Sequence, residues 1–193
     1  MLADGYLTGA TVCLDLNNNK VCDDGEPVAT TTDGGAFTID ATQTQIDSIP
    51  LLVEVTETTI DEDYPEKALT PYTLSAPAGY TFVSPLTSMV QNEIEKNGST
   101  LAIAEKAIQE LIGTTLSLDS DYIAGASDDS SSDENKVAFA KLHKVAQVVA
   151  SIVAEQMSDS ENDSYSTNAL SSAIMVAVIA NLESITQQVD ARY

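Results

Sequence analysis

Oxygen-bearing side chains recur at a regular spacing between Asp15 and Glu26, in the stretch DLNNNKVCDDGE. Counted from Asp15, they fall at positions 1, 3, 5, 9 and 12, which are Asp15, Asn17, Asn19, Asp23 and Glu26. This is the ligand spacing of a twelve-residue calcium loop, in which position 7, here Val21, contributes its backbone carbonyl. The spacing therefore predicts one calcium ion bound in this loop, with Glu26 able to bind it through both carboxylate oxygens.

Calcium suits such a loop because it is a hard cation that takes six to eight oxygen ligands, whereas magnesium is smaller and requires octahedral geometry. The alternative is an acidic turn that stays hydrated without a metal. Position 6, usually glycine, is Lys20, whose Cβ disfavours the left-handed backbone by about 1 kcal/mol. The flanking segments look like strands rather than helices, so we expect a static structural ion and not a calcium sensor.

Cys13 and Cys22 are the two cysteines of the chain, and they bracket much of this loop. A metal that orders the loop would bring the two sulfur atoms together, which favours a disulfide in an oxidising compartment. The alternative is a pair of buried thiols in a reducing cytosol. A zinc site is excluded because two cysteines and one distant histidine cannot supply four tetrahedral ligands.

The remaining reactive residues give no consistent catalytic set. His143 is the single histidine and lies in the apolar stretch AKLHKVAQVV, so we expect it on the flank of a helix. No G-x-S-x-G, S-x-x-K, Walker or G-x-G-x-x-G motif occurs. The acid pairs Asp61 with Asp63 and Asp119 with Asp121 would suit a glycosidase only at the right separation. The sequence therefore predicts that the protein is not an enzyme.

The charge of the chain restricts its partners. Thirty acidic and eight basic residues give a formal net charge of −22 over 193 residues, which repels nucleic acid and anionic membrane surfaces and favours cations. The longest apolar stretch, residues 169–182, is too short to span a bilayer, so we expect a buried helix and no membrane insertion. The first residues lack the pattern of a signal peptide, so the protein is either cytosolic or, as we expect, a mature segment of a longer extracellular protein.

Residues 1–82 are predicted to form a β domain. Short runs rich in Thr, Val and Ile, bounded by Gly, Pro, Asp and Asn, mark strands at residues 6–14, 28–32, 36–40, 51–56 and 72–76. Asp33, Gly34 and Gly35 predict a tight turn, because glycine readily adopts a positive φ.

From residue 83 the apolar residues recur with a helical period. A first helix is expected to start at Ser84 and Pro85 and to end at Gly98, and a second to run from Leu101 to Gly113. A third helix is expected at about residues 134–157 and a fourth at about 165–189, with acidic, serine-rich loops at 119–135 and 158–164. The predicted fold class is α+β: an antiparallel β-sandwich over residues 1–82, then a small four-helix bundle over residues 83–193.

The stretches LTGATVCLD and ATTTDGGAFTI, with Gly9, Val12, Thr32, Asp33, Gly35 and Phe37, resemble the carboxypeptidase-regulatory-like or prealbumin-like β-sandwich modules of secreted bacterial proteins. The stretch DLNNNKVCDDGEP is similar to the calcium loop of SdrD B-type repeats in bacterial surface adhesins. The resemblance covers about residues 5–56. It implies a β-sandwich with structural calcium, used as a spacer or adhesive module, with Asp15, Asn17, Asn19, Asp23 and Glu26 as ligands. The helical half resembles no family.

Two functions therefore stand side by side. The first is a calcium-stabilised structural or adhesive module of a secreted or surface-anchored bacterial protein or lipoprotein, placed outside the cell, on its surface, in the periplasm or at the outer membrane. The alternative is an extracellular module that binds a surface glycan or a peptide of another protein. A chain with no Trp and 5% aromatic residues favours the first, because glycan sites usually expose aromatic rings. We expect Tyr64, Tyr72 and Tyr80 to pack the junction between the halves, where a ligand groove would also lie.

Overall fold

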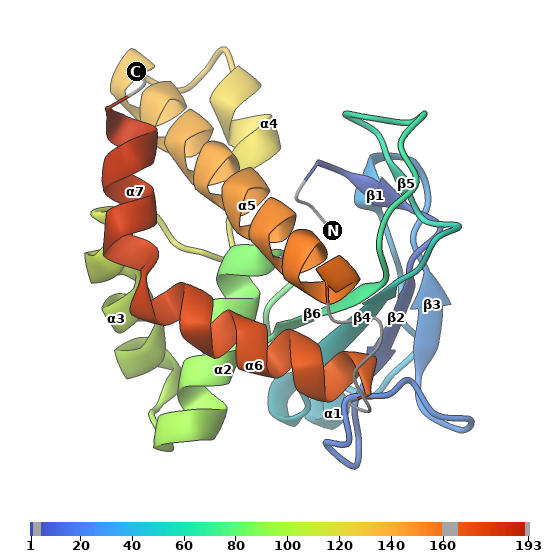
Figure 1. Ribbon diagram of the computed structural model, residues 1–193. Helices are drawn as coiled ribbons and strands as arrows, with labels where there is room; N and C mark the ends of the chain where they lie inside the picture. Colours follow the sequence, from blue (N-terminus) through green and yellow to red (C-terminus); the bar gives the residue numbers. More distant parts are fainter. Residues whose placement is uncertain (2–4, 160–165, 192–193) are drawn as a thin grey trace.

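The protein combines antiparallel sheets with helices, which confirms the α+β class. The computed structural model describes residues 1, 5–159 and 166–191, and in these residues six strands form two sheets beside seven α-helices. The strands are β1 (Leu7–Thr8), β2 (Thr11–Leu14), β3 (Val28–Thr30), β4 (Leu51–Val55), β5 (Ile60–Asp61) and β6 (Tyr72–Ala76). Figure 1 shows the strands on one side of the molecule and most of the helices on the other.

The main sheet has the order β3-β2-β4-β6, and all its neighbouring strands are antiparallel. Val12, Val53 and Leu74 lie opposite one another in its register and are buried. The predicted strand 6–14 is divided in two, because Gly9 has a φ of 85° and turns β1 away to pair with β5. The short β5 was missed because it contributes only Ile60 and Asp61 to a sheet.

In the segment after β3, one prediction is confirmed, one is wrong, and a helix was not predicted. The turn at Asp33, Gly34 and Gly35 is confirmed as a short 3₁₀ turn, which closes with a bridge between Thr32 and Ala36. The expected strand 36–40 is wrong, because no strand of the described residues pairs with this segment beyond that bridge. The helix α1 (Gln43–Ser48) follows; it was missed because its short polar sequence has no apolar period.

The first two helices of the second half agree with prediction. The helix α2 (Pro85–Asn97) begins at the N-cap Ser84, whose hydroxyl accepts hydrogen bonds from the amides of Leu86 and Thr87, and it ends at Gly98. The helix α3 (Leu101–Ile112) ends at Gly113, which is left-handed like Gly98. These ends were predictable because helix caps depend on the local sequence.

The later helices depart from prediction in two places. The loop expected at 119–135 contains α4 (Tyr122–Ser127), which Asp121 caps and which buries Tyr122. The third helix is confirmed as α5 (Asp133–Asp159). The fourth is broken into α6 (Thr167–Ala180) and α7 (Leu182–Asp190), because Asn181 leaves the helical conformation and donates a side-chain hydrogen bond to the carbonyl of Ala177. Most of the loop predicted at 158–164 lies outside the described residues.

Hydroxyl groups from two helices cover the outer edge of β6. The amide of Ser75 donates to Ser88 Oγ of α2 at 2.8 Å, and Ser88 and Thr87 hydroxyls donate back to the Ser75 carbonyl at 3.1 and 2.9 Å. The amide of Thr73 donates to Ser171 Oγ of α6 at 3.3 Å. A sheet edge normally exposes unpaired backbone groups, so these hydroxyls join the sheet to the helical half.

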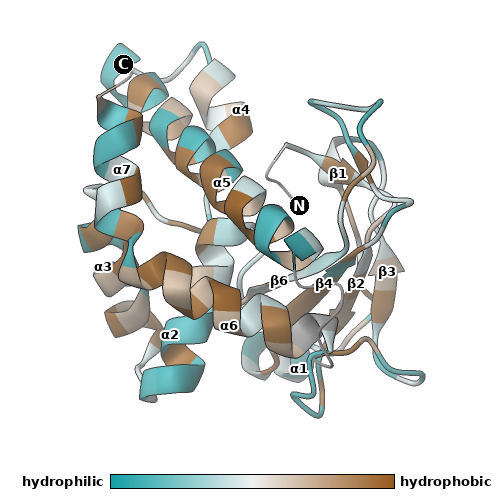
Figure 2. Cartoon of the chain, in the orientation of Figure 1, coloured by the Kyte–Doolittle hydropathy of each residue, from teal (hydrophilic) through white to brown (hydrophobic). Residues whose placement is uncertain are grey.

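Buried apolar side chains run from the sheet into the helices as one core. The core includes Leu7 of β1, Val53 of β4, Leu86 of α2 and Val149 of α5. Figure 2 shows hydrophobic colour along α6 and parts of α5, and hydrophilic colour on the loops beside β5. By length and composition α5 could cross a membrane, as could the bent pair α6 and α7, but here α5 packs against α2, α4, α6 and α7.

Candidate metal centre

The loop from Asp15 to Glu26 connects β2 to β3 and is held at both ends. The amide of Leu14 donates to the carbonyl of Pro27 at 3.0 Å, which closes the hairpin at the base of the loop. The amide of Asp15 donates to the carbonyl of Pro50 at 3.2 Å, just before β4. The sheet therefore fixes where the loop begins and ends.

The predicted disulfide between Cys13 and Cys22 is confirmed, with a Cα to Cα distance of 5.7 Å. Cys13 lies in β2 and is fully buried. The amide of Cys22 donates to Glu54 Oε1 at 3.1 Å, so β4 also contacts this part of the loop. The bridge ties the middle of the loop to the strand that precedes it.

Asp15, at position 1, has its carboxylate inside the loop. It is only 2% exposed. Its Oδ1 accepts the amide of Asn19 at 3.1 Å, and its Oδ2 accepts the amide of Lys20 at 3.0 Å. The first predicted ligand thus folds the loop back over itself, and each oxygen keeps a second lone pair.

Asn17, Asn19 and Asp23 come together on the other side of the loop. The amide groups of Asn17 and Asn19 donate to the same atom, Asp23 Oδ2, at 2.9 and 2.7 Å. Asn17 Oδ1 accepts the backbone amide of Asn19, and Asn19 Oδ1 accepts the backbone amide of Val21. Three predicted ligands from positions 3, 5 and 9 therefore converge.

Glu26 and Val21 complete the predicted set. Glu26 Oε1 accepts the amide of Leu16 at 2.8 Å, and Oε2 accepts the amide of Asp23 at 3.1 Å, so the carboxylate spans the loop from position 2 to position 9. No described residue donates a hydrogen bond to the Val21 carbonyl. That carbonyl is the predicted ligand at position 7.

The structure gathers the predicted ligands only in part. The side chains of Asn17 and Asn19 both contact Asp23 Oδ2. The carboxylates of Asp15 and Glu26 instead accept hydrogen bonds from backbone amides of the loop. In the described part of the chain, no three side chains of His, Cys, Asp or Glu form a group that could hold a metal. A cation at this loop would therefore depend on asparagine and backbone oxygens as well as carboxylates, which is the mixed oxygen set that calcium accepts.

Lys20 adopts the backbone conformation that position 6 requires, although it carries a Cβ. Its φ is 64°, in the left-handed region, and Asn18 has a φ of 55°. The Lys20 ammonium forms an ion pair with Glu95 on α2. This contact could not be found from the sequence, because the two residues lie 75 positions apart.

The carboxylates of the first candidate acid pair contact other groups of the protein. Asp63 Oδ2 accepts Gln147 Nε2 at 3.1 Å and lies 3.6 Å from His143 Nε2, both on α5. His143 also stacks on the ring of Tyr122. The carboxyl of Asp61 accepts the amide of Asp63 at 2.9 Å, and burial raises its pKa.

In the second acid pair, both carboxylates bind backbone amides. Asp119 Oδ1 accepts the amides of Thr81 and Phe82, each at 2.8 Å. Asp121 caps α4 and accepts the hydroxyl of Tyr6 at 2.9 Å. Both aspartates therefore connect the helical half to the β half.

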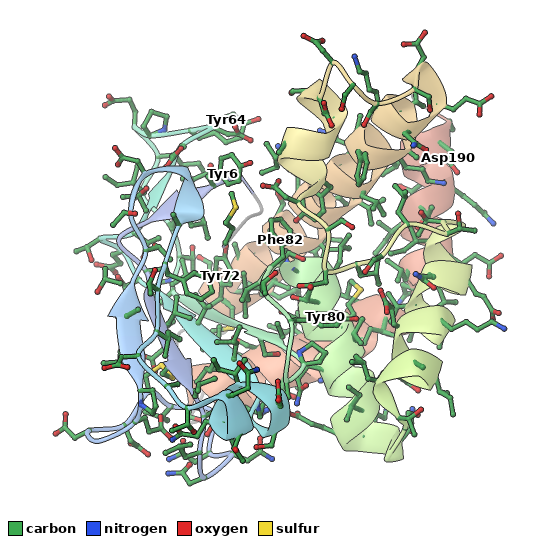
Figure 3. All side chains as sticks on the ribbon, turned by 180° about the vertical axis from the view of Figure 1, so that it is seen from behind. Tyr6, Tyr64, Tyr72, Tyr80, Phe82 and Asp190 are labelled. Atoms are coloured by element: carbon green, nitrogen blue, oxygen red, sulfur yellow. A yellow bond between two sulfur atoms is a disulfide. The ribbon has the colours of Figure 1, made fainter. Side chains whose placement is uncertain are left out.

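The three tyrosines predicted at the junction differ in position. Tyr72 is 2% exposed and Tyr80 is 9% exposed, and Figure 3 shows both near Phe82 between the sheet and the helices. Tyr64 is 58% exposed and lies on the loop that follows β5. The prediction of packing thus applies to Tyr72 and Tyr80, which leaves Tyr64 as the one exposed ring of the three.

Comparison of the chain with protein-family models, with curated proteins and with solved structures finds no match.

Proposed function

We propose that the protein is a calcium-stabilised structural or adhesive module of a secreted or surface-anchored bacterial protein, with a prealbumin-like β-sandwich and a small helical bundle. The observation that carries the proposal is the convergence of Asn17 and Asn19 on the carboxylate of Asp23, in a loop closed by a disulfide. The two asparagine amide groups donate to the same carboxylate oxygen of Asp23. A bound cation would balance the negative charge of that carboxylate in their place.

The disulfide supports the extracellular part of the proposal, because such bonds persist in oxidising compartments. The loop lies at the end of a sheet that is joined to the helices by hydrogen bonds and a common core. A metal that orders this loop would act on the stability of the module and not on a reaction. The cation would be held by Asp15, Asn17, Asn19, Asp23, Glu26 and the carbonyl of Val21.

Calcium titration calorimetry tests the proposal on protein first treated with a chelator. We expect one calcium ion to bind the wild type, and Glu26→Ala to abolish binding while circular dichroism shows the helices intact. Asp24→Asn is the matched control, because Asp24 lies in the same loop but outside the ligand spacing. The absence of calcium heat in the wild type, or equal loss of binding in both variants, would refute the site.

A further inference from the structure

Residues 37–41 belong to no strand or helix, and no described strand pairs with them. Phe37, Ile39 and Ala41 are partly buried, whereas Thr38 and Asp40 between them are exposed. This alternation has the period of a β-strand. The flanking residues are extended, with φ and ψ of −74° and 140° at Ala36 and −72° and 152° at Thr42.

The backbone of this segment has no hydrogen-bond partner among the described residues. Pairing ends at the Ala36 carbonyl, which accepts the amide of Thr32 at 2.8 Å, and resumes at Thr42, whose amide donates to Gln45 Oε1. Between them, no described residue makes a hydrogen bond with a backbone amide or carbonyl of residues 37–41. Such groups must bond to water, and an extended run of them is a template for an added strand.

An apolar pocket of about 200 Å³ adjoins the same segment. Phe37 and Ile39 line it together with Leu14 and Leu51 of the sheet, Ile46 of α1 and Ile49, which directly follows α1. Ile46 is 37% exposed, so the pocket reaches the surface. A cavity of about 150 Å³ holds a benzene molecule, so this pocket has room for one aromatic or branched aliphatic side chain.

The charge around the segment specifies what kind of chain would bind. Residues 21–66 contain twelve acidic residues and no Lys or Arg. Asp40 is exposed on the outward face of the segment and Asp47 is exposed on α1 beside it. A bound strand with basic residues is favoured by this field, and one with acidic residues is repelled.

We propose that residues 37–41 form a docking edge for an extended, basic peptide segment of a partner protein, which pairs with this backbone and places one apolar side chain in the pocket. Main-chain hydrogen bonds supply affinity in this mode of recognition, and pockets for alternate side chains supply specificity. The proposal is independent of calcium binding, because residues 37–41 lie outside the metal loop. It also explains why the strand predicted at 36–40 has the right pattern but no partner strand in the described part of the chain.

The probe for the test is the capped peptide acetyl-Thr-Lys-Phe-Lys-Thr-amide. Its phenylalanine points to one face of an extended chain and its lysines to the other, so the lysines lie on the side of Asp40 when the ring enters the pocket. Three altered probes remove one feature each: Phe to Ser, both Lys to Glu, and N-methylation of the three central backbone amides, which blocks strand pairing through either edge of the peptide. We expect each change to weaken binding at least tenfold.

Binding is measured by amide chemical shifts of the isotope-labelled wild-type protein, so the main result needs no variant. We expect the shifts to concentrate at residues 37–41 and on α1, and hydrogen exchange to slow at alternate amides of the segment. Ile39→Asp places a charge in the pocket and should abolish binding, whereas Ile103→Asp, at a 61% exposed site on α3, should not. Each variant is used only if its unfolding curve is cooperative.

The proposal is overturned if the peptide leaves the shifts of residues 37–41 unchanged at its solubility limit. It is equally overturned if the serine probe or the N-methylated probe binds as well as the parent, because then neither the pocket nor strand pairing is used. Tighter binding by the glutamate probe would refute the charge argument. Shifts centred on other residues would place the peptide elsewhere.

Discussion

The ammonium of Lys20 and the carboxylate of Glu95 form an ion pair that joins the loop between β2 and β3 to helix α2. Glu95 also accepts Gln91 Nε2 at 2.6 Å, so its carboxylate is held on the helix. Glycine at position 6 would fit the left-handed backbone better but could not make this contact. The left-handed conformation costs Lys20 about 1 kcal/mol, and a partly exposed ion pair contributes up to about 1 kcal/mol, so the two effects are of similar size.

Lys20→Gly should therefore raise calcium affinity several-fold and change the free energy of unfolding of the metal-free protein by less than about 1 kcal/mol. The affinity rises because the variant removes a positive charge from the loop and relieves its backbone. The stability changes little because loss of the ion pair offsets that relief. Calorimetry measures the affinity, and urea unfolding measures the stability.

Glu95→Gln separates the two effects, because it removes the ion pair but keeps the lysine in its left-handed conformation. We expect it to lower the free energy of unfolding by up to about 1 kcal/mol and to leave calcium affinity no tighter than in the wild type. If both variants tighten calcium binding equally, the ion pair itself opposes the metal and the argument from backbone strain fails.

The disulfide should stabilise the protein by about 2 to 3 kcal/mol and strengthen calcium binding. A chain without the bridge must order the loop when the metal binds, which costs about 1 to 2 kcal/mol for each backbone residue newly fixed. We therefore expect Cys13→Ser with Cys22→Ser to bind calcium more weakly at the same ionic strength. Equal affinity would mean that the strands alone hold the loop, and tighter binding would mean that the bridge opposes the metal.

The sequence predicted those features that depend on neighbouring residues. Ser84 and Gly98 marked the ends of α2, and the loop between Asp15 and Glu26 could be numbered, because caps and loop spacings are local patterns. Cys13 and Cys22 could be paired because one ordered loop brings both together.

Features that depend on distant partners could not be predicted. The run at residues 36–40 has the alternation of a strand, but pairing requires a second strand, and none of the described strands lies beside it. Asn181 breaks an apolar stretch that reads as one continuous helix, and the hydrophobic period carries no sign of the change in direction. The contact of Lys20 with Glu95 likewise depends on how α2 packs beside the sheet.

Ser88→Ala should destabilise the protein by about 1 to 3 kcal/mol, because it leaves the partly buried amide of Ser75 without its acceptor at the edge of β6. Ser88 itself is only 4% exposed. Ser151→Ala is the matched control, since Ser151 is exposed on α5 and only donates to the carbonyl of Gln147 in its own helix. Urea unfolding measures the free energy of unfolding of both variants. An equal loss in the two variants would show that the contact at the edge of β6 contributes no stability.

Asp119→Asn should stabilise the protein at pH 7. Burial raises the pKa of the Asp119 carboxyl, and the hydrogen bonds from the amides of Phe82 and Thr81 oppose that rise. The folded state then binds more protons than the unfolded state between about pH 3.9 and the raised pKa, so this carboxyl lowers stability as the pH rises through that window. Asparagine keeps the oxygen that accepts both amides and removes the charge.

Asp128→Asn should have the opposite effect on the free energy of unfolding and serves as the comparison. Hydrogen bonds from Ser130 lower the pKa of the Asp128 carboxyl, so its contribution to stability is complete above about pH 3.9 and is lost as the pH falls through the lowered pKa. Urea unfolding of the wild type and both variants at several pH values from 4 to 7 makes the test. We expect the gain from Asp119→Asn to grow with pH and then level off, while Asp128→Asn is less stable than the wild type at pH 7. Stability depends on pH only where the folded and unfolded states bind different numbers of protons. A gain from Asp119→Asn that is the same at every pH would therefore mean that burial does not raise the pKa of this carboxyl.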